Sequence, residues 1–164
     1  MVEDFGTLDV IIDSPPNGSK VKHQVPIKGR ITKKLPEKME LWIVKDVNNR
    51  YHPDDGPIDI IGETWESFAY VGNNAPRSDQ GVHFTIHIVE VSHETGKKFD
   101  AYLTGAKQTG NWPGINRTQI VLVTEKDLEN VAKYDGIIKK TITVIRNDPK
   151  PGIWGGLKRI FGGN

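Results

Sequence analysis

The sequence predicts a mainly β protein, an antiparallel β-sandwich with one or two helices in the crossover before the last strand. Three apolar runs carry this prediction, because each has the length and the β-branched or aromatic content of a strand. They span residues 40–45, 63–71 and 82–91, and turn-forming loops separate them. The chain also has 17 glycines and 10 prolines in 164 residues, which suits a fold with many turns.

The first half of the chain supplies the other early strands. Leu8–Ile12 is the first, and the Pro-Pro-Asn-Gly turn after it stops the extended structure. Residues 21–31 alternate between apolar and polar, which is typical of a half-buried strand, and Pro26 places that end at an edge or a strand start. Leu41–Val44 is apolar on both faces and predicts a central strand that is covered on both sides. Shorter extended segments follow at 51–52 and 58–61.

The pattern changes after Val91. Apolar residues between Glu94 and Lys107 have the spacing of an amphipathic helix of about three turns. A short strand at 119–124 precedes a second helix at 125–133, for which Thr124 is the expected N-cap. Ile137–Ile145 alternates again and is the expected last strand.

Composition narrows the classes of function. The net charge of +1 gives no field that would steer nucleic acid to the whole surface. Cysteine is absent, which excludes disulfides, thiolate metal sites and a cysteine nucleophile. The N-terminus lacks the basic and apolar regions of a signal peptide, and no apolar run approaches the ~20 residues of a membrane span. We therefore expect a cytoplasmic location.

Three regions differ in composition: an N-terminal arm at 1–7, the sandwich domain at 8–146, and a Pro/Gly hinge with an apolar, basic tail at 147–164. On a helix, the apolar residues of the tail would share one side, a face that suits a groove in a partner protein or, less well, a membrane surface. Packing back onto the domain and a disordered end are the alternatives. The candidate partner-binding residues are Trp154, Leu157, Lys158, Arg159, Ile160 and Phe161.

The apolar and turn pattern resembles immunoglobulin-like β-sandwich domains of bacteria and archaea. The resemblance rests on Ser14–Val21, Val25–Gly29, Leu41–Val44, the Tyr51-His-Pro segment with Trp65, and Phe84–Val89, and it covers about residues 8–146. Such domains are accessory modules of multidomain proteins that act as spacers or in adhesion and recognition, and the fold brings no catalytic residues with it. The missing disulfide and the long insertion at 105–135 depart from the antibody-type family.

Two kinds of residue suggest a metal, and neither leads to a metal assignment. His83 and His87 share a strand face at about 13 Å by strand rise, which is too far for one ion. Asp46, Asp54, Asp55 and Asp59 surround two loops and offer the oxygen ligands of calcium, but an Asp-Asp-Gly sequence also serves a turn.

No nucleophile elbow or phosphate-binding loop is present. Trp42 and Trp65 are expected in the core, whereas Trp112 either caps the crossover or presents its ring to a sugar or peptide. We expect aliphatic and indole side chains to close the interior, with no catalytic residue and no cofactor.

The predicted function is therefore a non-catalytic protein-interaction or scaffolding module with a C-terminal docking tail, and its protein partner stays unidentified. The alternative is a carbohydrate- or calcium-binding sandwich. The candidate ligand-binding residues of that alternative are Tyr51, Trp112, Asp54 and Asp55.

Overall fold

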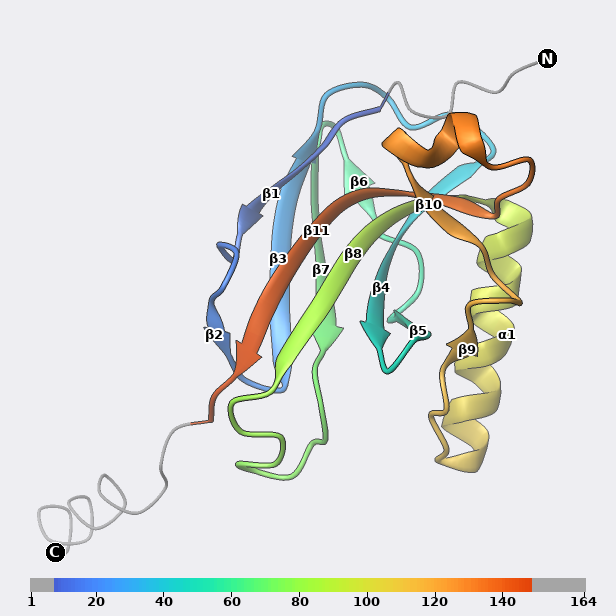
Figure 1. Ribbon diagram of the computed structural model, residues 1–164. Helices are drawn as coiled ribbons and strands as arrows, with labels where there is room; N and C mark the ends of the chain where they lie inside the picture. The colour runs from blue at the N-terminus through green and yellow to red at the C-terminus, as the bar shows by residue number, and fades with distance from the viewer. Residues whose placement is uncertain (1–7, 149–164) are drawn as a thin grey trace, which may run out of the picture.

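A computed structural model describes residues 8–148 and confirms a mainly β sandwich (Figure 1). A four-stranded sheet has the order β1-β3-β7-β6, and a seven-stranded sheet has the order β10-β11-β8-β4-β5-β9 with β2 beside β11. Neighbouring strands are antiparallel except for the short parallel pairs β10–β11 and β2–β11. The strands are β1 (Val10–Ser14), β2 (Lys20–Val21), β3 (Gln24–Ile31), β4 (Met39–Val47), β5 (Arg50–Asp54), β6 (Ile60–Ile61), β7 (Thr64–Tyr70), β8 (His83–Ser92), β9 (Ile115–Asn116), β10 (Leu122–Thr124) and β11 (Gly136–Arg146).

The small sheet follows the alternation of its central strand. Every second residue of β3 from Val25 to Ile31 is buried, as predicted from the sequence. The inward side chain at the third of these positions is the hydrogen of Gly29, and the buried indole of Trp65 lies against it. The indole Nε1 donates a hydrogen bond to the carbonyl of Arg30 at 3.3 Å. Gly29 therefore makes the space in which Trp65 packs between the sheets.

The large sheet is covered on both faces, as the apolar run in β4 predicts. Leu41 and Ile43 belong to the core between the two sheets, whereas Trp42 and Val44 belong to a second cluster on the opposite face. All four side chains are fully buried. Helix α1 (His93–Thr109) covers that second face, and its Phe99 meets Trp42 edge-on at 5.2 Å between ring centroids (Figure 1). Trp42 is thus a core residue, but it packs under the helix rather than between the sheets.

The connection from β8 to β11 holds the helices and differs in detail from the sequence-based expectation. Helix α1 begins at the N-cap Ser92, whose side chain accepts a hydrogen bond from the Thr95 N–H, and it ends at Gly110 with φ of 70°. The expected second helix is a 3₁₀ helix, η1 (Glu125–Asn130). Thr124 precedes it but donates its hydroxyl to Asp127 at 2.8 Å and caps no backbone N–H. The short, polar segment therefore makes about two tight 3₁₀ turns rather than an α-helix.

The interior is not closed by aliphatic and indole side chains alone, which corrects the expectation from the sequence. Asp54, His87, Glu90 and Arg146 are all buried. Both carboxylate oxygens of Glu90 lack a hydrogen-bond partner among residues 8–148. Two of the other three, Asp54 and Arg146, hold the walls of a cavity between the sheets.

Candidate functional site

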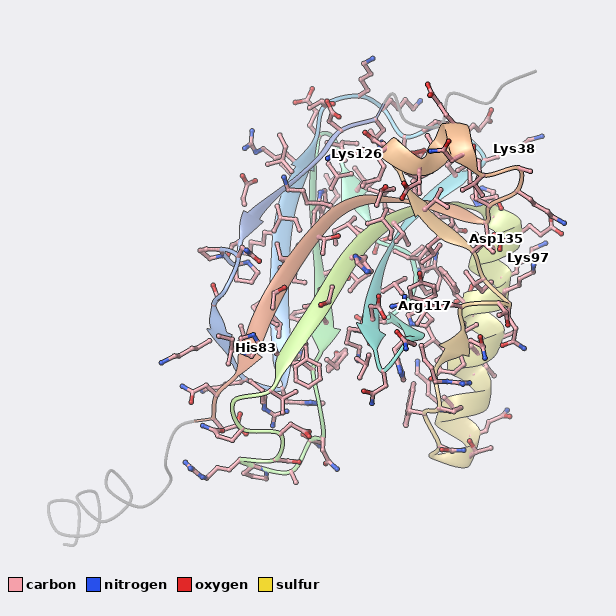
Figure 2. The ribbon with its side chains drawn as sticks, viewed as in Figure 1. Lys38, His83, Lys97, Arg117, Lys126 and Asp135 are labelled. Carbon is pink, nitrogen blue, oxygen red and sulfur yellow. The ribbon has the colours of Figure 1, made fainter. Side chains whose placement is uncertain are left out.

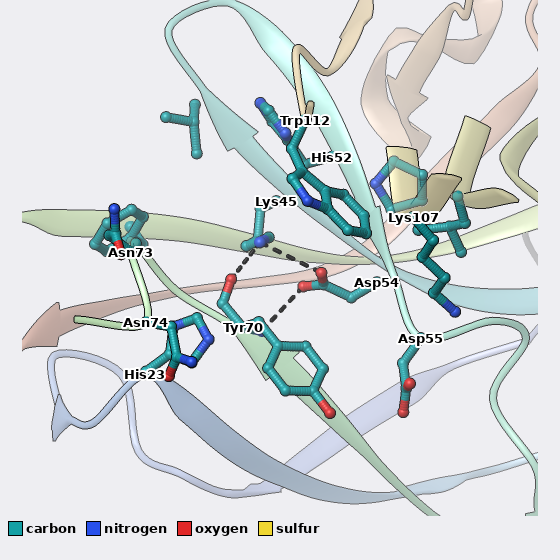
Figure 3. Close-up of a pocket in the computed structure, with 15 residues that line it drawn as sticks. His23, Lys45, His52, Asp54, Asp55, Tyr70, Asn73, Asn74, Lys107 and Trp112 are labelled. Carbon is teal, nitrogen blue, oxygen red and sulfur yellow. Dashed lines mark hydrogen bonds and ion pairs between the residues drawn. The ribbon is translucent and has the colours of Figure 1, made fainter. Parts of the chain in front are cut away.

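The cavity lies where β4 and β5 of the large sheet approach β7 of the small sheet (Figure 3). Its volume is about 670 Å³, within the range of small-molecule sites. The loop at 72–74 forms a second wall, and Leu103 and Lys107 of α1 and the Trp112 loop form the third. Elements from both sheets and from the β8–β11 connection therefore meet at this one place.

A buried ion pair between Lys45 and Asp54 forms the floor of the cavity. The Lys45 Nζ lies 3.3 Å from an Asp54 carboxylate oxygen, and both side chains are less than one-sixth exposed. Asp54 also accepts a hydrogen bond from the Tyr70 N–H at 3.2 Å, and Lys45 donates to the Tyr70 carbonyl. Dashed lines in Figure 3 mark these contacts. The pair thus satisfies the backbone N–H and carbonyl of Tyr70 on the edge of β7 opposite β3, where β6 reaches only Thr64 and Trp65.

Burial changes the protonation of two groups in the cavity wall. It raises the pKa of Asp54 to about 6, and the nearby ammonium of Lys45 opposes this shift. It lowers the pKa of His52 to about 4, and the charges of Lys45 and Arg50 add to this shift. His52 is therefore a neutral imidazole at pH 7, with one donor and one acceptor nitrogen.

Trp112 presents an aromatic surface at the cavity. Its side chain is 49% exposed, and its ring meets Tyr102 of α1 edge-on at 6.5 Å. The Tyr102 hydroxyl accepts a hydrogen bond from the Gly114 N–H at 2.9 Å, and Arg50 donates to the Pro113 carbonyl at 2.7 Å. Contacts with α1 and β5 therefore fix the loop and hold the indole in one orientation.

The structure brings together three of the four predicted ligand residues. Trp112, Asp54 and Asp55 line the cavity. Tyr51 does not, because its side chain points to the opposite face of β5, where it is buried under the guanidinium of Arg117 at 5.3 Å. Tyr51 and Asp54 lie three residues apart in β5, so their side chains point to opposite faces of the sheet and the structure does not bring them into one site.

The predicted histidine pair is divided between two environments. His83 is exposed and is the first residue of β8. In Figure 2 it lies far from Arg117, which is paired with Asp46, the residue beside His87. His87 is buried; its Nδ1 lies 2.7 Å from the Thr141 hydroxyl, and its Nε2 lies 3.5 Å from Asp46. Within residues 8–148, no three His, Asp or Glu side chains come together as metal ligands.

Sequence reasoning missed Lys45, His52 and Tyr70, all of which line the cavity. A signal for Lys45 was present, because it shares the inward parity of Leu41 and Ile43 and follows them directly in β4. A charged residue at an inward position requires a partner, but the sequence gives no indication that this partner is Asp54.

The tail residues predicted to bind a partner lie outside the described part of the chain. They are Trp154, Leu157, Lys158, Arg159, Ile160 and Phe161. Among residues 8–148, no helix has the length and apolar content needed to cross a membrane. No protein-family model, curated protein or solved structure matches the chain.

Proposed function

We propose that this protein is a non-catalytic binding module with an immunoglobulin-like sandwich, and that its ligand is a neutral saccharide held in the cavity beside Trp112. The strand order supports the immunoglobulin-like assignment. One sheet has the order β1-β3-β7-β6, and the facing sheet contains β11-β8-β4-β5. These correspond to the A-B-E-D and G-F-C-C′ orders of immunoglobulin domains, with β2 parallel to the last strand.

The exposed indole of Trp112 is the observation that carries the ligand assignment. Aromatic rings offer an apolar face to the C–H groups of a sugar, and this ring is already held in place by Tyr102 and Arg50. The cavity also contains neutral groups that both donate and accept hydrogen bonds, among them His52 and the Asn74 amide. Hydroxyl groups of a saccharide match such a mixed set.

Charge within the cavity favours a neutral ligand. Lys45 and Asp54 neutralise each other, and one further cation, Lys107, is balanced by one further anion, Asp55. A charged ligand would bring a further charge without a partner into a partly buried site, which costs free energy. A neutral polyhydroxylated ligand incurs no such cost.

Calcium is the less well supported ligand. The carboxylate of Asp54 already receives the Lys45 ammonium and the Tyr70 N–H. A calcium ion at Asp54 would have to displace that ammonium and would lie next to it, where like charges repel. Among residues 8–148, Asp55 is the one other acidic residue of the cavity wall, and calcium takes 6–8 oxygen ligands.

Catalysis is not part of the proposal because the charged pair has a structural role. Lys45 and Asp54 are bound to each other and to the backbone of β7, so the contacts that the pair makes join the two sheets. The proposal that the tail docks a protein partner is separate. Deletion of residues 153–161 tests it, since a partner captured by the full chain must then be lost while the melting temperature of the domain is unchanged.

Calorimetric titration with neutral hexaoses of glucose, mannose and xylose tests the saccharide proposal. We expect one of them to bind the full chain and Trp112→Ala to abolish the binding heat. Ile61→Ala is the matched control, because Ile61 is 82% exposed and lies outside the cavity. Absence of binding by every hexaose, or equal loss of binding in both variants, refutes the proposal.

A further inference from the structure

Arg146, the last residue of β11, is almost fully buried and uses its whole hydrogen-bonding capacity. Its side chain is 1% exposed. Nη1 donates to the carbonyls of Val71 at 2.6 Å and Asn73 at 2.8 Å, and Nη2 donates to the carbonyl of Ala75 at 3.4 Å. Nε and Nη2 donate to the two carboxylate oxygens of Asp148 at 3.0 and 2.8 Å. All five guanidinium N–H groups are therefore engaged.

Asp148 joins the Arg146 guanidinium to the loop at 72–81. Its carboxylate also accepts a hydrogen bond from the Arg77 N–H at 2.6 Å. Gln80 exchanges hydrogen bonds with the Asp148 backbone, at 2.9 Å to its N–H and 3.3 Å to its carbonyl. The hydrogen bonds from Arg146 keep the pKa of Asp148 below its usual value, so the Asp148 carboxylate is ionised at neutral pH.

The loop that Arg146 holds is a wall of the cavity. Gly72, Asn73 and Asn74 line the cavity, as does His23, the residue just before β3. The Nδ1 of His23 lies 3.2 Å from the Val71 carbonyl, the same oxygen to which Arg146 donates. Arg146 thus holds the Val71 carbonyl in place, and this carbonyl in turn contacts the His23 ring.

Loop 72–81 depends on Arg146 and Asp148 for its shape. Arg77 and Asp79 have φ values of 62° and 58°, in the left-handed region that side chains other than glycine rarely adopt. The Gly81 N–H donates to the Arg146 carbonyl at 2.7 Å. Contacts from the end of β11 therefore hold a strained loop in one conformation.

We propose that Arg146, locked by Asp148, is a positioning residue for the cavity, which fixes the His23 and Asn73–Asn74 wall and thereby sets the affinity for the ligand. The inference on affinity rests on the proposed function. The inference on position does not, because it concerns the wall in the absence of ligand. Arg146 itself is absent from the cavity lining and acts through the backbone of the loop.

The test compares Asp148→Asn and Arg146→Lys with Asp13→Asn and Arg30→Lys in the full chain. Arg30 and Asp13 form a two-bond pair of the same chemistry, at 2.8 and 2.9 Å, on the edge of the small sheet and outside the cavity. NMR chemical shifts of the His23 ring and the Asn74 side-chain amide, measured without ligand, show whether the cavity wall keeps its conformation. Calorimetric titration with the hexaose that the wild-type chain binds, at a temperature well below the melting temperature of each variant, measures the affinity of each variant.

We expect both variants at Arg146 and Asp148 to shift the His23 and Asn74 resonances and to weaken hexaose binding by about tenfold. The two control variants leave resonances and affinity unchanged. Unshifted resonances in Asp148→Asn, or an equal loss of affinity in Asp13→Asn, overturn the proposal. If the wild-type chain binds no hexaose, the proposed function fails, and the ligand-free resonances still decide whether Arg146 positions the wall.

Discussion

Replacement of Gly29 by alanine would place a methyl group where Gly29 packs tightly against Ile11 and Trp65. A Cβ atom at this position would lie 2.0 Å from the backbone oxygen of Ile11 on β1 and 2.3 Å from Cζ2 of the Trp65 ring. Neither neighbour is the free end of a flexible side chain. Either β1 must separate from β3, or the indole must leave its place between the sheets.

Both responses are costly. Overpacking a core with one extra carbon costs about 1–3 kcal/mol, and losing the packing of a buried tryptophan costs about 3–5 kcal/mol. We therefore expect Gly29→Ala to lower the free energy of unfolding by about 3–5 kcal/mol. Domains have about 5–15 kcal/mol in total, so the variant keeps at best a small margin of stability.

Urea unfolding followed by tryptophan fluorescence measures this loss. With a slope of about 2 kcal/mol per molar urea, the midpoint falls by about 2 M. Gly105→Ala is the control of opposite sign, because Gly105 lies in α1 with nothing within 4 Å of its added Cβ. Alanine there stabilises by about 0.5–1 kcal/mol through helix propensity. A Gly29→Ala midpoint within 0.3 M of the wild type refutes the packing argument.

Two further predictions concern the buried carboxylates Asp54 and Glu90, and a third concerns calcium. Lys45→Met leaves Asp54 buried without its partner and lowers the unfolding free energy by about 3–5 kcal/mol in chemical denaturation. A second change, Asp54→Leu, restores only part of this loss, because the Tyr70 N–H and carbonyl then lack the partners that Asp54 and Lys45 supply. Glu90 is fully buried and its pKa is raised to about 6, so the folded protein binds a proton at Glu90 more tightly than the unfolded chain does. As the pH rises from 4.5 to 6, the wild type should therefore lose about 2 kcal/mol of unfolding free energy relative to Glu90→Gln. Parallel curves of unfolding free energy against pH for the two proteins would contradict this. Millimolar calcium should leave the melting temperature unchanged, and a rise that Asp55→Asn removes would restore the calcium alternative.

The sandwich was predictable because its strands follow the two-residue period. The alternation in β3 and the apolar faces of β4 were both visible in the sequence, and they fix which side chains meet between the layers. The tight form of η1 was not predictable, because an acidic first turn after a threonine suits an α-helix and a 3₁₀ turn equally. The short strand β9 was missed because its partner β5 is set only by tertiary packing.

The candidate site was partly predictable. Trp112 and the two adjacent aspartates were singled out from an aromatic loop and an Asp-rich turn, and both segments line the cavity. Lys45 and Tyr70 join it through pairing across sheets, and no local pattern encodes that pairing. The role of Arg146 depends on a loop more than 60 residues earlier in the chain, so its spacing in the sequence carries no sign of it.

The most direct test of saccharide binding in the cavity is a two-dimensional NMR titration of the four indole N–H signals with the neutral hexaose. If the proposal holds, the Trp112 signal moves in a saturable way, while the buried Trp42 and Trp65 signals stay in place. Assignment by Trp112→Phe identifies the signal. A static Trp112 signal under saturating hexaose, or a larger shift at Trp42 or Trp65, contradicts a ligand site in this cavity.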